Sequence, residues 1–283
     1  MMRYFYLVIV AVLLLVASLA LMDEPAVVGS LSAATVNRIR TIYAIGQALG
    51  NRADVFSKVG DSITVSFYFL QPIGEGLYHL GDHAGLQPVI DRFSATNARA
   101  GNSFSNPSLA AGVGWAAWGV LDPALADPLH CLPGEAPLVC EYRLTRPSIA
   151  LIMFGTNDAA YRSPQQYRSD LFQIVEISKQ MGVIPILSTI PPVPGYEMQV
   201  RELNGVVVEI TTAENLPLWD YGEVMRELPN FGLGWDNLHP SVPPDGYEAA
   251  ADFRPPNLQY GYVMRNLTAL QMLDTVWREL QGA

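Results

Sequence analysis

The sequence predicts an α/β protein in which a mostly parallel central sheet is covered by helices on both faces. Several short apolar runs are continuous rather than alternating, which is typical of strands buried on both faces. Helical patterns of roughly 10 to 17 residues separate the later runs. The chain of 283 residues is long enough to bury its own core. We therefore expect a three-layer α/β/α sandwich.

The expected elements begin with an amphipathic helix over residues 32–49, which Gly50 ends. A strand over residues 55–59 follows and runs into Gly60, Asp61 and Ser62. The later elements are recognised by the same patterns, with strands expected over residues 94–98, 149–154, 184–189 and 216–221 and helices over 165–181, 198–213 and about 260–280.

Two stretches interrupt this alternation of strands and helices. Residues 104–147 form an insertion that carries both cysteines, and residues 241–258 are rich in proline. We expect both to be surface excursions that shape a pocket. The folded domain is expected to span residues 31–283, with the insertion inside it.

The N-terminal segment predicts that the chain is addressed to a membrane. Residues 4–22 form 19 consecutive apolar or weakly polar positions, with Arg3 before them and two acidic residues after them. As a helix this run spans roughly 28 Å, close to a bilayer core. Small residues at positions 18 and 20 also offer a cleavage site. Residues 1–30 are therefore a cleaved signal peptide or an N-terminal transmembrane anchor, and the rest of the chain is extracytoplasmic, either secreted or anchored.

The two cysteines, Cys131 and Cys140, are expected to form a disulfide. They lie nine residues apart in a stretch rich in Pro and Gly that can bend back on itself. Closing so short a loop stabilises the fold by about 2 to 3 kcal/mol. Two unpaired buried thiols are the alternative. A metal site is disfavoured because no second pair of Cys or His has ligand spacing nearby.

Charge disfavours a nucleic acid partner. The formal net charge is -10, and the chain has only two lysines, Lys58 and Lys179. Such a surface repels a phosphate backbone. With 50% apolar and 16% charged residues, the composition also excludes a disordered chain.

Three polar motifs follow expected strands or lie near the C-terminus. They are GDSIT at residues 60–64, GTND at 155–158 and DNLHP at 236–240. In α/β sheets the ligand site lies at the carboxyl ends of the strands, so these motifs are expected to meet there. Together they supply a hydroxyl, an amide donor, and a carboxylate paired with an imidazole. This is the inventory of a Ser/His/Asp acyl-transfer site.

In this order, about 95 and 80 residues apart, the motifs resemble those of the SGNH (GDSL) hydrolase family. Residues 97–103 loosely resemble the glycine block of that family. The resemblance covers roughly residues 52–283 and does not explain the N-terminal segment or the insertion. It implies a flavodoxin-like fold and cleavage of carboxylic esters without a cofactor.

The resemblance also implies roles for individual residues. Ser62 is similar to the nucleophile, and His239 and Asp236 to the other members of the triad. The Ser62 backbone N–H, Gly101 and Asn157 are similar to the oxyanion hole. The chemistry agrees, because a serine hydroxyl needs a base to take its proton and a glycine lets its N–H approach a substrate oxygen closely.

Each motif also has a simpler interpretation. Residues 60–62 could form a helix N-cap after a strand, residues 157–158 a turn, and Asp236 a surface carboxylate. Within the family interpretation, Asp61 and Asp158 are expected to brace loops rather than react. His79 and His83 have the spacing of two metal ligands on a helix, but Gly81 between them disfavours a helix, so no metal site is expected.

The function expected from the sequence is an extracytoplasmic serine hydrolase of the esterase, deacetylase or lipase type that acts through an acyl-serine intermediate. Its substrate, a small-molecule, carbohydrate or lipid ester, stays open. An O-acyltransferase acting on a surface polysaccharide and a non-catalytic envelope binding protein are the alternatives. The aromatic segment 67–78, with Trp115 and Trp118, either lines a pocket or packs in the ordinary way.

Overall fold

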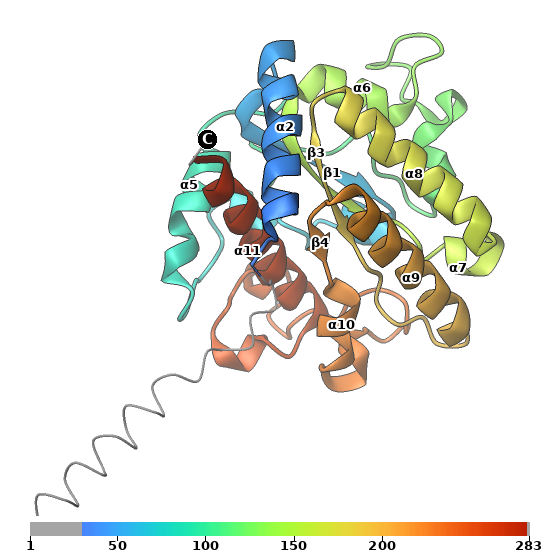
Figure 1. Ribbon diagram of the computed structural model, residues 1–283. Coiled ribbons are helices and arrows are strands. Elements are labelled where there is room, and N and C mark those ends of the chain that lie inside the picture. The colour runs from blue at the N-terminus through green and yellow to red at the C-terminus, as the bar shows by residue number, and fades with distance from the viewer. Residues whose placement is uncertain (1–29, 282–283) are drawn as a thin grey trace, which may run out of the picture.

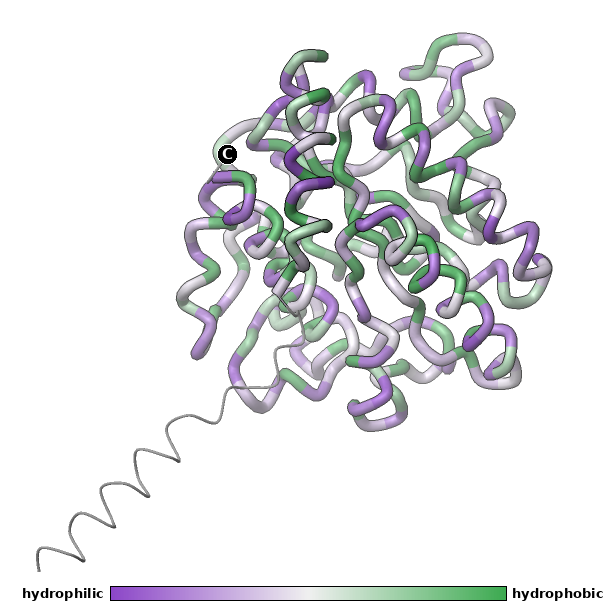
Figure 2. Tube along the Cα trace, viewed as in Figure 1, coloured by the Kyte–Doolittle hydropathy of each residue, from purple (hydrophilic) through white to green (hydrophobic). Residues whose placement is uncertain are grey.

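The computed structural model describes residues 30–281, and its centre is a sheet of four parallel strands in the order β1-β2-β3-β4. Figure 2 shows hydrophobic residues gathered in the middle of the molecule, and every residue of the strands 147–153 and 184–188 is buried there. The strands expected over 55–59, 149–154 and 184–189 are confirmed. The bounds of the four strands are Arg52–Gly60 for β1, Pro147–Met153 for β2, Ile184–Ser188 for β3 and Leu218–Trp219 for β4.

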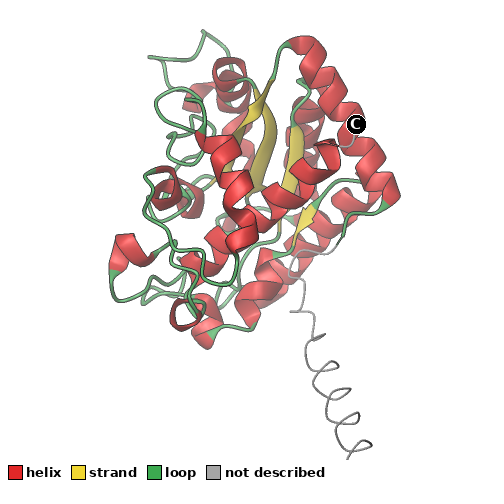
Figure 3. Cartoon of the chain, turned by 90° about the vertical axis from the view of Figure 1, so that its left-hand side faces the viewer, coloured by secondary structure: helices red, strands yellow, loops and turns green. Residues whose placement is uncertain are grey.

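Helices cover both faces of this sheet and complete the expected three-layer α/β/α sandwich (Figures 1 and 3). On one face α11 (Gly261–Gln281) packs against α2 (Ala33–Leu49) and α5 (Gln87–Ser94). On the other face α8 (Pro164–Gln180) packs against α9 (Glu197–Glu214). Since parallel crossovers are right-handed, the connections from β2 to β3 and from β3 to β4 place α8 and α9 on the same face.

The long helices begin and end where their capping residues stand. Ser32 caps α2 by accepting a hydrogen bond from Thr35 N at 3.1 Å, and Gly50 ends the helix with a left-handed φ of 83°. Ser163 and Gln166 form a capping box at the start of α8. The expected helices over 32–49, 165–181, 198–213 and 260–280 are therefore confirmed to within two residues.

Two expected strands differ from the structure. The strand expected over 94–98 is absent: α5 ends at Ser94, and the chain beyond it is irregular. Apolar residues at helical spacing, with a proline in the first turn, favour the helix, and the Phe93 ring packs edge-on against Phe56. The strand expected over 216–221 shrinks to two residues because α10 begins at Tyr221.

After α5 the chain runs along the free edge of β1 without forming a regular strand. Halfway along β1, Phe56 N donates to Ser103 Oγ at 3.1 Å. At the end of β1, Gly112 N donates to Gly60 O at 3.1 Å, in a parallel bridge. Residues 97–112, called the edge segment below, therefore run parallel to β1 and cover its outer side.

The insertion 104–147 is not the surface excursion that we expected along its whole length. Its last part is helix α6 (Pro137–Thr145), which contacts β1 and buries Leu138 and Tyr142 in the core. This expectation was wrong for α6 because its polar residues find buried partners, as Glu141 does with Ser57 Oγ at 2.8 Å. The earlier part holds 3₁₀ helices at Ala117–Leu121 and Pro123–Leu125.

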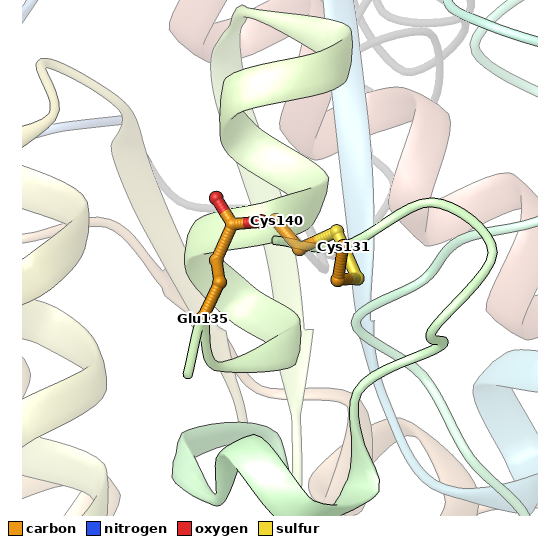
Figure 4. A group of neighbouring side chains, drawn as sticks. All are labelled: Cys131, Glu135 and Cys140. Atoms are coloured by element: carbon orange, nitrogen blue, oxygen red, sulfur yellow. A yellow bond between two sulfur atoms is a disulfide. The ribbon is translucent and has the colours of Figure 1, made fainter. Parts of the chain in front are cut away.

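The disulfide between Cys131 and Cys140 is present and ties the loop before α6 to that helix (Figure 4). Glu135 lies close to both sulfur atoms, so the three side chains have the proximity of metal ligands. All three already have partners, however. Arg143 Nε donates to Glu135 Oε1 at 2.7 Å, and Leu132 N donates to Glu135 Oε2 at 2.8 Å. The group is explained by a disulfide and an ion pair.

The remaining elements are short. The short helices are α3 (Ser62–Val65), α4 (Gln71–Gly74), α7 (Asp158–Tyr161) and α10 (Tyr221–Arg226), with 3₁₀ turns at Ala84–Leu86, Pro229–Gly232, Gly246–Ala249 and Pro255–Asn257.

Within residues 30–281 no helix combines the length and the apolar character needed to cross a bilayer. Residues 1–29, which carry the predicted segment 4–22, lie outside the described residues.

Candidate active site

Ser62 is the first residue of α3, directly after the carboxyl end of β1. Asp61 caps this helix, because its Oδ1 accepts a hydrogen bond from Ile63 N at 2.9 Å. Glycine is required at position 60 because β1 and β2 come close together there, and a Cβ on this residue would lie 2.6 Å from Met153 O on β2. The strand, the glycine and the cap together place the Ser62 side chain at the edge of the sheet where ligands bind.

The structure brings Ser62, His239 and Asp236 into one hydrogen-bonded chain. Ser62 Oγ lies 2.9 Å from His239 Nε2, although the two residues are 177 positions apart in the sequence. On the other side of the ring, His239 Nδ1 lies 2.6 Å from Asp236 Oδ2. This order of hydroxyl, imidazole and carboxylate allows proton transfer from the serine to the histidine.

The loop that carries His239 and Asp236 is closed by its own backbone. Gly234 N donates to His239 O at 2.8 Å, and Asn237 takes a left-handed φ of 54° to make the turn. Asp236 Oδ1 accepts hydrogen bonds from the N–H groups of His239 and Leu238 at 3.0 and 3.1 Å. Partial burial alone would raise the pKa of Asp236, but hydrogen bonds from the His239 ring and from these N–H groups hold the pKa below its usual range.

Of the three expected oxyanion donors, Ser62 N belongs to the residue that begins α3, and Asn157 follows β2, the strand next to β1. Ser62 N is the first N–H of α3, and among the described residues it has no hydrogen-bond acceptor. Asn157 stands at the start of α7, after β2, and donates one amide hydrogen to Trp115 O at 3.0 Å. Its other amide hydrogen has no acceptor among the described residues.

Gly101, the third expected donor, does not lie at this site. Ser103 pairs with Phe56 in the middle of β1, so Gly101, two residues earlier in the edge segment, lies level with the first half of that strand. The residue that reaches the end of β1 is Gly112, beside Gly60. Residues 110–112, and not the expected residues 97–103, are therefore the part of the edge segment that lies beside Gly60. The sequence contained a signal for a close backbone approach at this place, the two glycines Gly112 and Gly114. A Cβ on Gly112 would overlap the Trp115 ring.

The pocket that contains Ser62 and His239 has a volume of about 360 Å³ and aromatic walls. Phe67 and Tyr68 line it from the segment after α3, which is one of the two interpretations left open for the aromatic segment 67–78, and Trp235 lines it from the loop before Asp236. Trp115 and Trp118 do not line it. The proline-rich stretch 241–258 contributes Ser241 and Val242, so it helps to shape a pocket as expected.

Asp61 and Asp158 brace the loops around the site, as we expected. Both are fully buried. Burial raises the pKa of Asp61 to about 6, although the hydrogen bond from Ile63 N and the charge of Arg265 oppose the shift. Burial also raises the pKa of Asp158 to about 6, against the hydrogen bond from Ala117 N, which reaches its Oδ1 at 3.0 Å. Asp61 thus holds the first turn of α3, and Asp158 holds the backbone N–H of Ala117 in the insertion.

The substitution Asp61→Asn is expected to stabilise the protein at alkaline pH. The pKa of Asp61 is about 6 in the folded chain against an ordinary value of 3.8, so the contribution of the protonated carboxyl to stability is complete below pH 3.8 and is lost as the pH rises through 6. Asparagine keeps an acceptor for Ile63 N and does not ionise. Urea unfolding should show a variant more stable by up to about 3 kcal/mol at pH 8, and a much smaller difference at pH 4.

The exposed Asp245→Asn serves as the control for this prediction, since it removes a carboxylate outside the core. It should leave the free energy of unfolding within about 0.5 kcal/mol of wild type at both pH values. A gain for Asp61→Asn that is equal at pH 4 and pH 8 would show that ionisation of Asp61 is not its cause.

Comparison with known proteins finds similarity among solved structures, while no family model and no curated protein matches the chain. A lipase/acylhydrolase from Enterococcus faecalis is 20% identical, with 79% of this chain and 95% of that chain covered and a TM-score of 0.49. A GDSL-like lipase from Bacteroides thetaiotaomicron is 15% identical, with 85% and 98% covered and a TM-score of 0.47. An acetylxylan esterase from Geobacillus stearothermophilus is 18% identical, with 77% and 93% covered and a TM-score of 0.46.

Proposed function

We propose that this chain is a serine hydrolase of the GDSL type that cleaves carboxylic esters. One observation carries the proposal: the hydrogen-bonded chain from Ser62 Oγ through His239 to Asp236 stands at the carboxyl end of β1 and opens into a pocket. This arrangement turns a weakly nucleophilic hydroxyl into an attacking group, because the imidazole removes its proton as the bond to substrate forms.

The proposed reaction has two halves. Ser62 Oγ attacks the ester carbonyl while His239 Nε2 accepts the serine proton, and the same nitrogen then returns the proton to the leaving alcohol. Water, activated by His239, next releases the acid from Ser62. Asp236 keeps the proton of His239 on Nδ1 throughout, so that Nε2 faces the serine.

The oxyanion of the tetrahedral intermediate is expected to accept hydrogen bonds from Ser62 N and Asn157 Nδ2. A third donor is expected from the loop 112–114 in place of Gly101. Two contacts support this assignment, because Gly112 pairs with Gly60 and Trp115 O accepts from Asn157 at 3.0 Å. The loop thus lies between the end of β1 and the amide of Asn157.

The substitution Asn157→Ala is expected to lower kcat by about 10² to 10³-fold with a smaller change in KM, because an oxyanion donor acts mainly in the transition state. Steady-state hydrolysis of 4-nitrophenyl acetate measures both constants. Asn37→Ala, an exposed position on α2, is the matched control and should keep the wild-type kcat. A kcat for Asn157→Ala within threefold of wild type would remove Asn157 from the oxyanion hole.

The function itself is tested by a fluorophosphonate probe and a panel of substrates. We expect the probe to label the protein, and we expect hydrolysis of 4-nitrophenyl esters of graded chain length or of acetylated xylan. Labelling with acyl transfer to an added sugar, and little hydrolysis, would favour the O-acyltransferase. Absence of both labelling and turnover would favour the non-catalytic envelope binding protein.

We also propose an extracytoplasmic location for the domain. The disulfide between Cys131 and Cys140 supports it, because such bonds persist in oxidising compartments. The apolar segment 4–22 supports it from the sequence.

A further inference from the structure

A second cavity, of about 260 Å³, borders α3 and shares Ser66 with the pocket of Ser62. One wall is formed by residues 64–66, next to Ser62, and another by residues 105–108 of the edge segment. The reaction proposed above uses none of these residues. Most of the polar groups that line the cavity are neutral hydroxyls and amides, from Thr64, Ser66, Gln71, Ser105, Asn106 and Ser108.

Lys58 is the one charged side chain among the residues that line this cavity. It lies on β1 two residues before Gly60 and is only 7% exposed. Its Nζ donates to Phe104 O at 2.6 Å, and this is its single acceptor among residues 30–281. An ammonium carries three N–H groups, so two of them lack a protein partner. Lys179, the other lysine of the chain, is in contrast paired with Glu176 and Glu214.

Burying an ammonium group without a carboxylate partner costs free energy of folding, so its presence here points to a functional site. Burial lowers the pKa of Lys58 to about 8, while the charge of Glu141 opposes the shift and that of Arg265 adds to it. Glu141 does not neutralise Lys58 directly, because its two oxygens accept from Ser57 Oγ and Leu109 N. Near neutral pH the ammonium therefore stays largely protonated and incompletely bonded.

We propose that this cavity binds a carboxylate group, with Lys58 as its charged partner and the side chains of Thr64, Asn106 and Ser108 as its neutral donors. One ammonium among neutral groups matches one negative charge, and charge-assisted hydrogen bonds are the strong ones. The carboxylate belongs either to the acyl part of a substrate, in which case the inference rests on the proposed function, or to a free carboxylic acid anion. The common wall formed by Ser66 places the cavity within reach of a short acyl chain on Ser62.

The substrate source is tested with two esters of equal acyl length. Mono-4-nitrophenyl glutarate ends in a carboxylate where 4-nitrophenyl pentanoate ends in a methyl group. We expect Lys58→Met, which keeps the length of the side chain without its charge, to lower the ratio of kcat/KM for the glutarate ester to that for the pentanoate ester by about 10 to 100-fold. Lys179→Met is the matched control and should keep the wild-type ratio.

The free-anion source is tested by calorimetric titration of the full chain with glutarate, which needs no turnover. We expect Lys58→Met to weaken glutarate binding at least about tenfold and Lys179→Met to leave it unchanged. Lys58→Gln, which still donates to Phe104 O but carries no charge, is the second variant in case the first fails to fold, and a thermal melt checks both.

The possible outcomes distinguish a failure of the proposed carboxylate site from a failure of the proposed function. A loss in either the kinetic ratio or the glutarate affinity, confined to the Lys58 variants, supports the carboxylate site. Folded Lys58 variants that change neither quantity overturn it. If the wild-type protein cleaves neither ester, the titration alone decides on the site: glutarate binding that depends on Lys58 supports it, and the absence of binding in the wild type overturns it. The proposed function fails only if 4-nitrophenyl acetate is not cleaved either.

Discussion

Replacing Ser62 by alanine is expected to lower kcat for ester hydrolysis by at least about 10⁴-fold. The reason is that no acyl-enzyme can form once Oγ is gone, so that only the oxyanion donors and substrate binding still contribute. The hydroxyl makes its one close contact with His239 Nε2, at 2.9 Å, so its loss should leave the fold intact. Hydrolysis of 4-nitrophenyl acetate measures kcat, and a thermal melt confirms folding.

The exposed serine Ser169 on α8 provides the matched control for this experiment. Ser169→Ala should retain wild-type kcat and fluorophosphonate labelling, while Ser62→Ala should lose both. A Ser62→Ala protein that is folded, labelled and active within tenfold of wild type would mean that another residue is the nucleophile. The proposed function would then lose the observation on which it depends.

The second large effect is expected from Asp236→Asn, which should lower kcat by about 10³ to 10⁴-fold. Asparagine can still accept from the N–H groups of His239 and Leu238, which Asp236 Oδ1 binds at 3.0 and 3.1 Å, so the loop should keep its shape. Its amide group, however, presents a donor to His239 Nδ1. The ring then favours the tautomer with the proton on Nε2, which cannot accept the proton of Ser62.

Asp245→Asn, a short distance along the same part of the chain, controls for the loss of one negative charge. We expect this exposed variant to keep kcat within twofold of wild type. KM should change little in Asp236→Asn, because the carboxylate orients the histidine and does not bind the ester in the proposed reaction. Equal kcat values for wild type and Asp236→Asn would reduce Asp236 to a residue that only shapes the loop.

Most of the layer structure could be predicted because its signals are local. Strands β2 and β3 are continuous apolar runs with one simple physical interpretation, and α8 is delimited by a capping box at Ser163. The strand expected over 94–98 failed because the apolar residues just before it repeat at helical spacing and bury Phe93 against Phe56. The helical spacing of these apolar residues becomes visible only over a longer stretch than the five residues, 94–98, that suggested a strand.

The candidate site also has a part that could be predicted from short motifs and a part that could not. Ser62 follows the end of β1, and Asp236 and His239 stand in one tight loop, so short motifs were sufficient to predict that these three residues lie together. The position of Gly101 depended instead on how the edge segment passes along β1, which is decided by contacts between distant residues such as Phe56 and Ser103. The burial of Lys58 beside a cavity depends on the same path. No short window of sequence contains that information.

The path of the edge segment also bears on the behaviour of the protein in concentrated solution. An open sheet invites extended segments of other molecules to pair with its outermost strands and start aggregates. Here residues 97–112 already occupy backbone groups of β1 at Phe56 and Gly60, and at the opposite margin β4 is only two residues long. Neither margin gives an incoming chain a long row of unpaired amide and carbonyl groups, so the folded domain is protected from edge-to-edge fibril growth.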